Sequence, residues 1–295
     1  MSIRRNIQYA RILVLVMGTA LLLGVLAACD TSGGAKGTTT PPGVTIKIAA
    51  DLPVTGLAAS SGKPIENGAR LAIDEANADK NFLPGYTFAF VPLDDAGAAG
   101  YADPSVGAVN VTSLIEDAEV AGIIGPFNSA AAQSELPLSN PAPLAQLGPS
   151  STSVCLTQNT PDTGCVGQDD VLSQVRPTAR VTYFRIAATD NHQGEVGADY
   201  AFKTLKDTSA FVVDDTTLYG SDIAQAFVSK FKADGGDVLD QDSIAATTDY
   251  TQELRKIAAR RPDIIYFAGL DATGGILMRK QMASTPGLER TPFMG

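Results

Sequence analysis

Short segments rich in serine, threonine and glycine are the parts of this sequence best suited to hold a ligand. Residues 127–129 (Phe-Asn-Ser) and 148–152 (Gly-Pro-Ser-Ser-Thr) each lie between an expected strand and an expected helix. Hydroxyl groups and free backbone N–H groups at a helix N-terminus attract an anion such as a carboxylate. The same residue types also cap helices that bind nothing, and the sequence leaves both interpretations open. The candidate ligand-binding hydroxyls are those of Ser129, Ser150, Ser151 and Thr152.

Other polar side chains follow expected strands in the second half. Tyr219 is placed to cover a ligand, or it is a partly buried ring with a hydrogen-bonded hydroxyl. Asp271 follows an expected strand, and it either faces a ligand ammonium or caps a helix. In the first half, the adjacent carboxylates of Asp94 and Asp95 either bind a cation or are solvated.

The sequence fits no catalytic or metal-binding template. His192 is the single histidine and there are three cysteines, too few for a structural zinc site. No G-x-S-x-G nucleophile motif is present. The segment from Gly56 to Lys63 departs from a phosphate loop, because five residues separate its glycines and Pro64 stands where Ser or Thr is needed. We therefore expect no enzyme, no cofactor and no metal.

Composition and charge narrow the function further. The chain has 295 residues, of which 44% are hydrophobic and 18% charged, as in folded domains. It carries 22 Lys and Arg against 32 Asp and Glu, for a formal net charge of -10. Because nucleic acids are bound largely through basic side chains, an acidic chain argues against such a partner.

The N-terminus has the pattern of a bacterial export signal. Three arginines, the last at Arg11, precede an uncharged apolar stretch over residues 12–28. This is typical of a secretory signal peptide, and an uncleaved membrane anchor is the alternative. Leu26–Cys29 resembles the lipobox of bacterial lipoproteins, in which Cys29 would be lipid-modified. We predict that residues 1–29 direct an extracytoplasmic protein held on the membrane by acyl chains.

Beyond a flexible tether at residues 30–43, rich in Gly, Ser, Thr and Pro, strand and helix patterns alternate. The expected strands are 44–50, 86–93, 120–124, 143–147, 183–188, 210–213, 238–246, 264–268 and 292–294, with helices between them. This alternation predicts an α/β fold of two doubly wound parallel-sheet lobes, 44–175 and 176–295, with a cleft between them. Ligands bind beyond the carboxyl ends of strands in such sheets.

Two cysteines remain once Cys29 is assigned to the lipobox. An even pair in an exported chain favours a disulfide between Cys155 and Cys165, and free thiols are the alternative.

An ordered series of segments carries a family resemblance. They include IKIAADLPVTG (46–56), GKPIENGARLAIDEANA (62–78), IIGPFNSAAAQSELPLSN (123–140), LGPSSTS (147–153), DDTTLYG (214–220) and TPFMG (291–295). Together they resemble the leucine/isoleucine/valine-binding proteins, the substrate-binding proteins of branched-chain amino-acid ABC transporters, which have the type I periplasmic-binding-protein fold. The resemblance implies capture of an amino-acid-like solute by hinge closure and its delivery to a membrane permease.

The same resemblance assigns roles to the candidate residues. It implies that Ser129 binds the ligand carboxylate, that the backbone of Ser150 meets the ligand and that Thr152 holds both of its ends. Tyr219 would contact the ligand from the second lobe. Ser61 falls where leucine-binding members have a tyrosine near the ligand side chain.

Three alternative functions stay open, and the sequence differs from the family in one further respect. A sensor lipoprotein of the same fold, a membrane-anchored interaction protein and an exported enzyme are the competing classes. In the family, the motif that ends this chain at Gly295 is followed by more sequence, including an acidic residue that meets the ligand ammonium. We therefore expect the second lobe to be incomplete and residues 30–295 alone to bind weakly or fold poorly.

Overall fold

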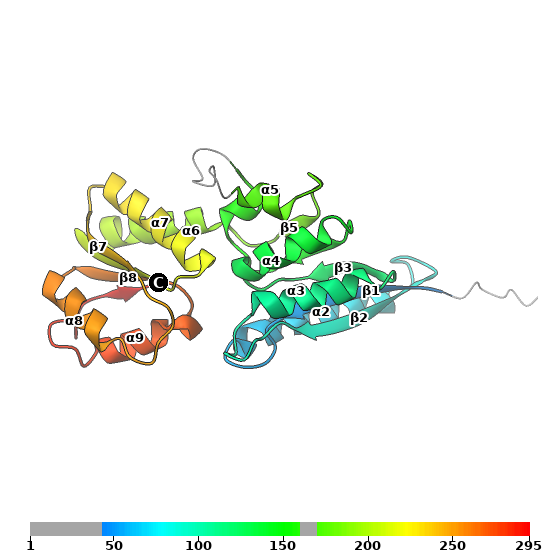
Figure 1. Cartoon of the computed structure of the whole chain (residues 1–295), viewed down its shortest axis with the longest axis horizontal. Coiled ribbons are helices and arrows are strands. Elements are labelled where there is room, and N and C mark those ends of the chain that lie inside the picture. The colour runs from blue at the N-terminus through cyan, green and yellow to red at the C-terminus, as the bar shows by residue number, and fades with distance from the viewer. Residues whose placement is uncertain (1–42, 160–169) are drawn as a thin grey trace, which may run out of the picture. The chain divides into compact units, whose positions relative to one another are not determined.

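Figure 1 shows the computed structural model, which describes residues 43–159 and 170–295. The predictions for the signal segment, Cys29, the tether up to Pro42 and Cys165 lie outside the described residues. In the two described ranges, no helix is long and apolar enough to cross a membrane.

The first sheet has five strands, all parallel, in the order β2-β1-β3-β4-β5. Its strands are β1 (Val44–Leu52), β2 (Tyr86–Asp94), β3 (Val120–Ile124), β4 (Ala145–Gly148) and β5 (Tyr183–Arg185). Its helices are α2 (Ala59–Ala78), α3 (Pro104–Ile115), α4 (Ser129–Ser139), the short η1 (Val154–Leu156) and α5 (Val171–Val175). Because parallel crossovers are right-handed, this order puts α2 on one face of the sheet and α3 and α4 on the other.

The second sheet has four strands, also parallel, in the order β7-β6-β8-β9. They are β6 (Ser209–Asp214), β7 (Asp237–Ser243), β8 (Ile264–Ala268) and β9 (Phe293–Met294). The helices are α6 (Asp190–Asp199), the π-helical turn η3 (Tyr200–Leu205), α7 (Leu218–Ala233), α8 (Thr251–Arg260), the 3₁₀ turn η4 (Asp271–Thr273) and α9 (Gly275–Met282).

Alternation along β6 separates the second half into two cores. Val212 points to α6 and α7, where Phe227 stacks on Tyr266 with ring centroids 3.8 Å apart. Phe211 points the other way, to a cluster with Leu254 and other side chains of α8 and α9. Figure 1 shows the two helix pairs on opposite sides of this sheet. Successive strand residues face opposite sides, so a fully buried strand must be apolar at every position, as β6 is over residues 210–213.

The predicted fold class is confirmed, but one strand lies in a different sheet from the one expected. Residues 183–188 were predicted to open the second lobe at 176–295. Instead β5 pairs with β4, through Gln146 and Tyr183, and completes the first sheet. The first lobe therefore extends past residue 175. Local apolar patterning predicts that a segment is a strand, but its pairing partner is a long-range choice that leaves no local signal.

Candidate functional site

A cavity of about 460 Å³ lies where loops from both sheets meet. The loops that line it follow the carboxyl ends of strands or begin helices, as the general rule for parallel sheets requires. The first-sheet lining consists of Ala58, Tyr101, Ala102, Pro104, Phe127, Asn128, Ser129, Ala130, Ser150 and Thr152. The remainder is Gln193, Thr217, Tyr219, Leu270 and Thr273.

Ser129 is the first residue of α4 and is 1% exposed. Its Oγ accepts hydrogen bonds from the backbone N–H groups of Thr152 at 3.2 Å and Ser153 at 3.0 Å. A hydroxyl that accepts two bonds still has its own hydrogen to donate. The helix is capped by Asn128, whose Oδ1 accepts from Ala131 N at 2.7 Å. Ser129 therefore presents a donor to the cavity at a helix N-terminus, where partial positive charge collects.

The serines after β4 hold the two first-sheet loops together. Ser150 Oγ donates to Phe127 O at 2.6 Å, and Ser150 also lines the cavity. Ser151 is fully buried, and its Oγ donates to Pro126 O at 2.9 Å. Ser151 does not line the cavity. It lies behind the lining, where its hydrogen bond holds the two loops together.

Thr152 lies beside a buried carboxyl group. Burial raises the pKa of Asp190, at the start of α6, to about 7, while its contact with the Thr152 hydroxyl opposes that rise. Asp190 is behind the lining, and Thr152 is in it.

Tyr219 closes the cavity from the second sheet. Its hydroxyl accepts a hydrogen bond from Gln193 Nε2 at 3.1 Å. Burial raises the pKa of Tyr219, so the phenol stays protonated and can still donate. The N-cap of α7, Thr217, also lines the cavity and accepts from Gly220 N at 3.0 Å. The start of a second helix is thus at the cavity wall.

Two predicted site residues are not in the lining. Ser61 is exposed in the first turn of α2, which begins at Ala59. Asp271 instead lines a neighbouring, more open hollow of about 740 Å³ together with Lys280. The η4 turn explains this placement, because Leu270 lines the cavity, Asp271 lines the hollow and Thr273 lines both.

The structure adds residues that the sequence did not single out. Tyr101, Gln193 and Thr273 all line the cavity. Tyr101 ends a loop of small residues after β2, so its position after a strand was the available signal. Thr273 offered none, since its role depends on the fold of η4.

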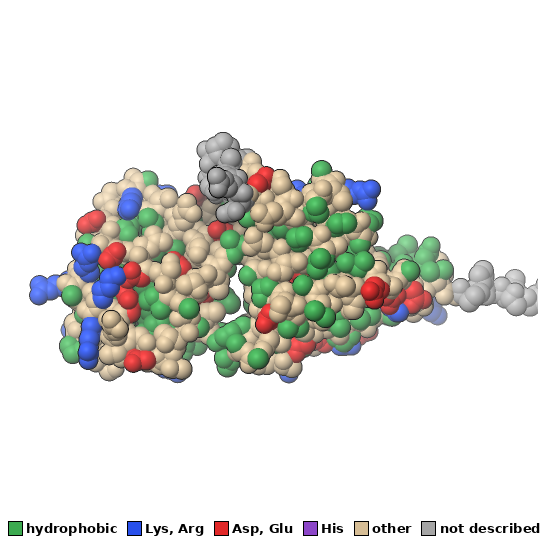
Figure 2. Space-filling model, viewed as in Figure 1, with side chains coloured by type: hydrophobic (Ala, Val, Ile, Leu, Met, Phe, Trp, Pro, Cys, Tyr) green, Lys and Arg blue, Asp and Glu red, His purple; other side chains and the backbone are tan. Residues whose placement is uncertain are grey.

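The lining is apolar and hydroxyl-bearing, and none of its described residues is Asp, Glu, Lys or Arg. On the face shown in Figure 2, Lys and Arg side chains gather mostly over the second-sheet half.

Residues 43–159 and 170–295 contain no cluster of three or more His, Cys, Asp or Glu that could hold a metal ion. Asp95 is fully buried, not solvated. Cys155 is disulfide-bonded.

Solved structures share this fold. The leucine binding protein LivK from Thermotoga maritima superposes with a TM-score of 0.66 at 23% identity, covering 84% of this chain and 62% of that one. A solute binding protein of an ABC transporter from R. palustris, in complex with benzoate, gives a TM-score of 0.66 at 21% identity over 84% of this chain and 61% of that one. At these identities the likeness shows the fold alone.

Sequence comparison shows the family. The Leu/Ile/Val-binding protein BraC3 of Rhizobium johnstonii is 30% identical over 236 residues, which are 80% of this chain and 57% of that protein. The chain thus spans a little over half the length of this curated relative. The model of the periplasmic binding protein family matches residues 45–294. Since that match takes in both sheets and every loop of the cavity, the chain belongs to the periplasmic binding protein family.

Proposed function

We propose that the full-length protein is an extracytoplasmic solute-binding protein that captures a branched-chain or related amino acid and delivers it to an ABC transporter permease. The Ser129 hydroxyl carries this proposal, because it is fixed by two N–H groups and has its hydrogen free for a ligand carboxylate. The name of the curated relative, a Leu/Ile/Val-binding protein, supports the choice of solute.

Binding begins in the first lobe. The solute carboxylate accepts hydrogen bonds from Ser129 and from backbone N–H groups at the start of α4. Hydrogen bonds to a charged group contribute roughly 1.5–3 kcal/mol each. The apolar part of the solute lies against Pro104, Phe127 and Leu270, which line the same cavity.

Closure brings the second lobe over the bound solute. Tyr219 and the N-terminus of α7 approach the solute from that side. The two lobes come together by rotation about a hinge between them. The closed form is the species presented to the permease. In this proposal, Cys29 carries the lipid that keeps the protein at the membrane. Residues 30–43 are then the tether, and the lobes follow.

Calorimetric titration of the full-length protein tests the solute class. Leucine, isoleucine and valine should bind, and leucinamide should bind at least tenfold more weakly, because it keeps the side chain and ammonium but lacks the carboxylate. Equal affinity for leucine and leucinamide would contradict the proposed site. Binding of benzoate but not leucine would keep the carboxylate site and change the solute.

A sensor lipoprotein of the same fold would bind the same solute without transporting it. Deletion of the gene separates the two roles. Loss of leucine uptake supports transport, and normal uptake with a lost transcriptional or chemotactic response supports the sensor.

A further inference from the structure

Tyr101 lies between the cavity and the neighbouring hollow. It comes from the loop after β2, in the first sheet, and lines both the cavity and the neighbouring hollow of about 740 Å³. Its hydroxyl donates a hydrogen bond to the carbonyl oxygen of Ala272, in the η4 turn after β8 of the second sheet. The Tyr101 side chain thus borders both spaces, as Thr273 does, and also makes a direct bond between loops of the two sheets.

The loop that carries Tyr101 is fixed to the first sheet. Ala96 and Ala102 form an isolated bridge across it, and Ala58 N donates to Gly100 O at 2.9 Å. Gly100 has a φ of +80°, and a Cβ there would lie 2.7 Å from the backbone nitrogen of Leu57. Only glycine fits this close backbone approach. The tyrosine is therefore held in position from its own side.

The η4 turn is fixed to the second sheet. Thr273 Oγ1 donates to the buried carboxylate of Asp215, which also accepts from Leu270 N at 3.3 Å. Tyr250 donates its hydroxyl to Thr273 O at 3.3 Å. Because Leu270 and Thr273 line the cavity, a displacement of η4 would move two residues of the cavity lining. Two braced loops consequently meet at one bond that can open without unfolding either.

We propose that the Tyr101–Ala272 hydrogen bond is a latch that holds the two loops together over the cavity and sets the rate at which the solute escapes through the neighbouring hollow. The kinetic part of this proposal rests on the solute-binding function, whereas the hydrogen bond between the two loops is a feature of the fold itself. Tyr101 is a positioning residue: it orders η4, and η4 in turn places Leu270 and Thr273.

The test compares Tyr101→Phe, which removes only the hydroxyl, with Tyr200→Phe, a control at an exposed tyrosine of η3. Hydrogen–deuterium exchange on the full-length protein without solute is measured first. We expect faster exchange over residues 270–275 in the Tyr101 variant and no change in the control. Gly100→Ala, which displaces the loop backbone, should have the same effect over 270–275.

Stopped-flow dissociation of leucine is measured second. Loss of one hydrogen bond should raise the dissociation rate constant roughly 3- to 10-fold, with a smaller change in the association rate constant. If wild-type protein does not bind leucine, the solute assignment fails while the exchange data still decide the latch. Unchanged exchange over 270–275 in Tyr101→Phe overturns the latch, whatever the binding result. Faster exchange with an unchanged leucine dissociation rate overturns its gating role.

Discussion

A single hydroxyl, that of Ser129, has two tasks in the first lobe. It accepts two backbone N–H bonds that fix the loop after β4, and its own hydrogen remains available at the cavity lining. Ser129→Ala should therefore weaken leucine binding by at least tenfold. It should also lower the free energy of unfolding by about 1–3 kcal/mol, because the N–H groups of Thr152 and Ser153 lose their acceptor. Calorimetry and urea unfolding measure the two effects.

Ser113→Ala is the matched control for this change. Ser113 is an exposed serine of α3 whose Oγ donates to Asn110 O within the same helix. It should leave leucine binding unchanged and alter stability by less than about 0.5 kcal/mol. If the Ser129 variant kept wild-type affinity, the carboxylate would have to dock elsewhere.

Three buried carboxyl groups lie close together in the first lobe. Asp51, Asp95 and Glu135 are each fully inaccessible to solvent. Burial, then the nearby carboxylates of Asp51, Asp94 and Asp103, raise the pKa of Asp95 to about 8. Burial also raises the pKa of Asp51 and of Glu135, even though Asn110 and Gln146 donate hydrogen bonds to them.

Raised carboxyl pKa values make the fold more stable in mild acid. The folded state holds protons that the unfolded chain has lost, so this contribution is complete below about pH 4 and is lost as the pH rises to about 8. Wild-type protein should lose stability on the order of 1–3 kcal/mol between about pH 5 and about pH 8. Asp95→Asn, which stays neutral, should lose less. Urea unfolding at both pH values measures the difference. An equal change in the free energy of unfolding between the two pH values for both proteins would contradict the raised pKa of Asp95.

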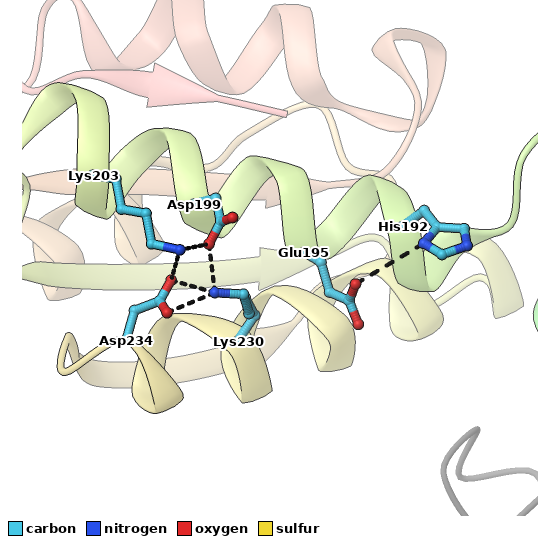
Figure 3. A network of polar contacts seen from close by, with 6 residues as sticks. All are labelled: His192, Glu195, Asp199, Lys203, Lys230 and Asp234. Atoms are coloured by element: carbon cyan, nitrogen blue, oxygen red, sulfur yellow. Dashed lines mark hydrogen bonds and ion pairs between the residues drawn. The ribbon is translucent and has the colours of Figure 1, made fainter.

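At the scale of elements, α6 and α7 pack closely enough to exclude a methyl group. A Cβ at Gly194 would lie 2.5 Å from the Cβ of Ala226 and 2.7 Å from the carbonyl oxygen of Ile223. Figure 3 shows ion pairs across the far ends of the same helices, where Lys230 of α7 contacts Asp199 of α6, and Lys203 of η3 lies 3.5 Å from Asp234 at the end of α7. Small residues and charge pairs thus determine the spacing of this helix pair, which carries Gln193 and Tyr219 to the cavity.

Gly194→Ala should therefore separate the two helices. Because two backbone atoms are among the neighbours that its methyl group would meet, relief is difficult, and we expect a loss of about 1–3 kcal/mol of stability. Gly68→Ala in α2 is the matched control. A Cβ there would meet nothing within 4 Å, so this change should be neutral or stabilising by up to about 1 kcal/mol. Thermal melting compares them, and equal melting temperatures would contradict the packing argument.

At the scale of the whole molecule, the proposed hinge closure makes a measurable prediction. Saturating leucine should reduce the radius of gyration of the full-length protein in small-angle X-ray scattering, because it would raise the population of the closed form in which Tyr101 bonds to Ala272. The reduction should be absent with leucinamide at the same concentration. An unchanged radius of gyration despite tight leucine binding would indicate a preclosed cavity.

Alternation of strand and helix patterns was enough to predict the fold class, since a buried strand and an amphipathic helix have different apolar periods. The assignment of residues 183–188 failed, because the choice between pairing with β4 and opening a new sheet is made by contacts distant in sequence. The same limit applies to the site. Ser129, Ser150, Thr152 and Tyr219 line the cavity, whereas Ser61 and Asp271 do not.

The sequence by itself determined that two parallel sheets form and that hydroxyl-bearing loops follow their strands, because these features depend on local composition and period. Only the tertiary structure decided which of those loops meet, which way the η4 turn faces and that Tyr101 bonds to Ala272. Those outcomes follow from the packing of segments far apart along the chain, so no short stretch of sequence specifies them.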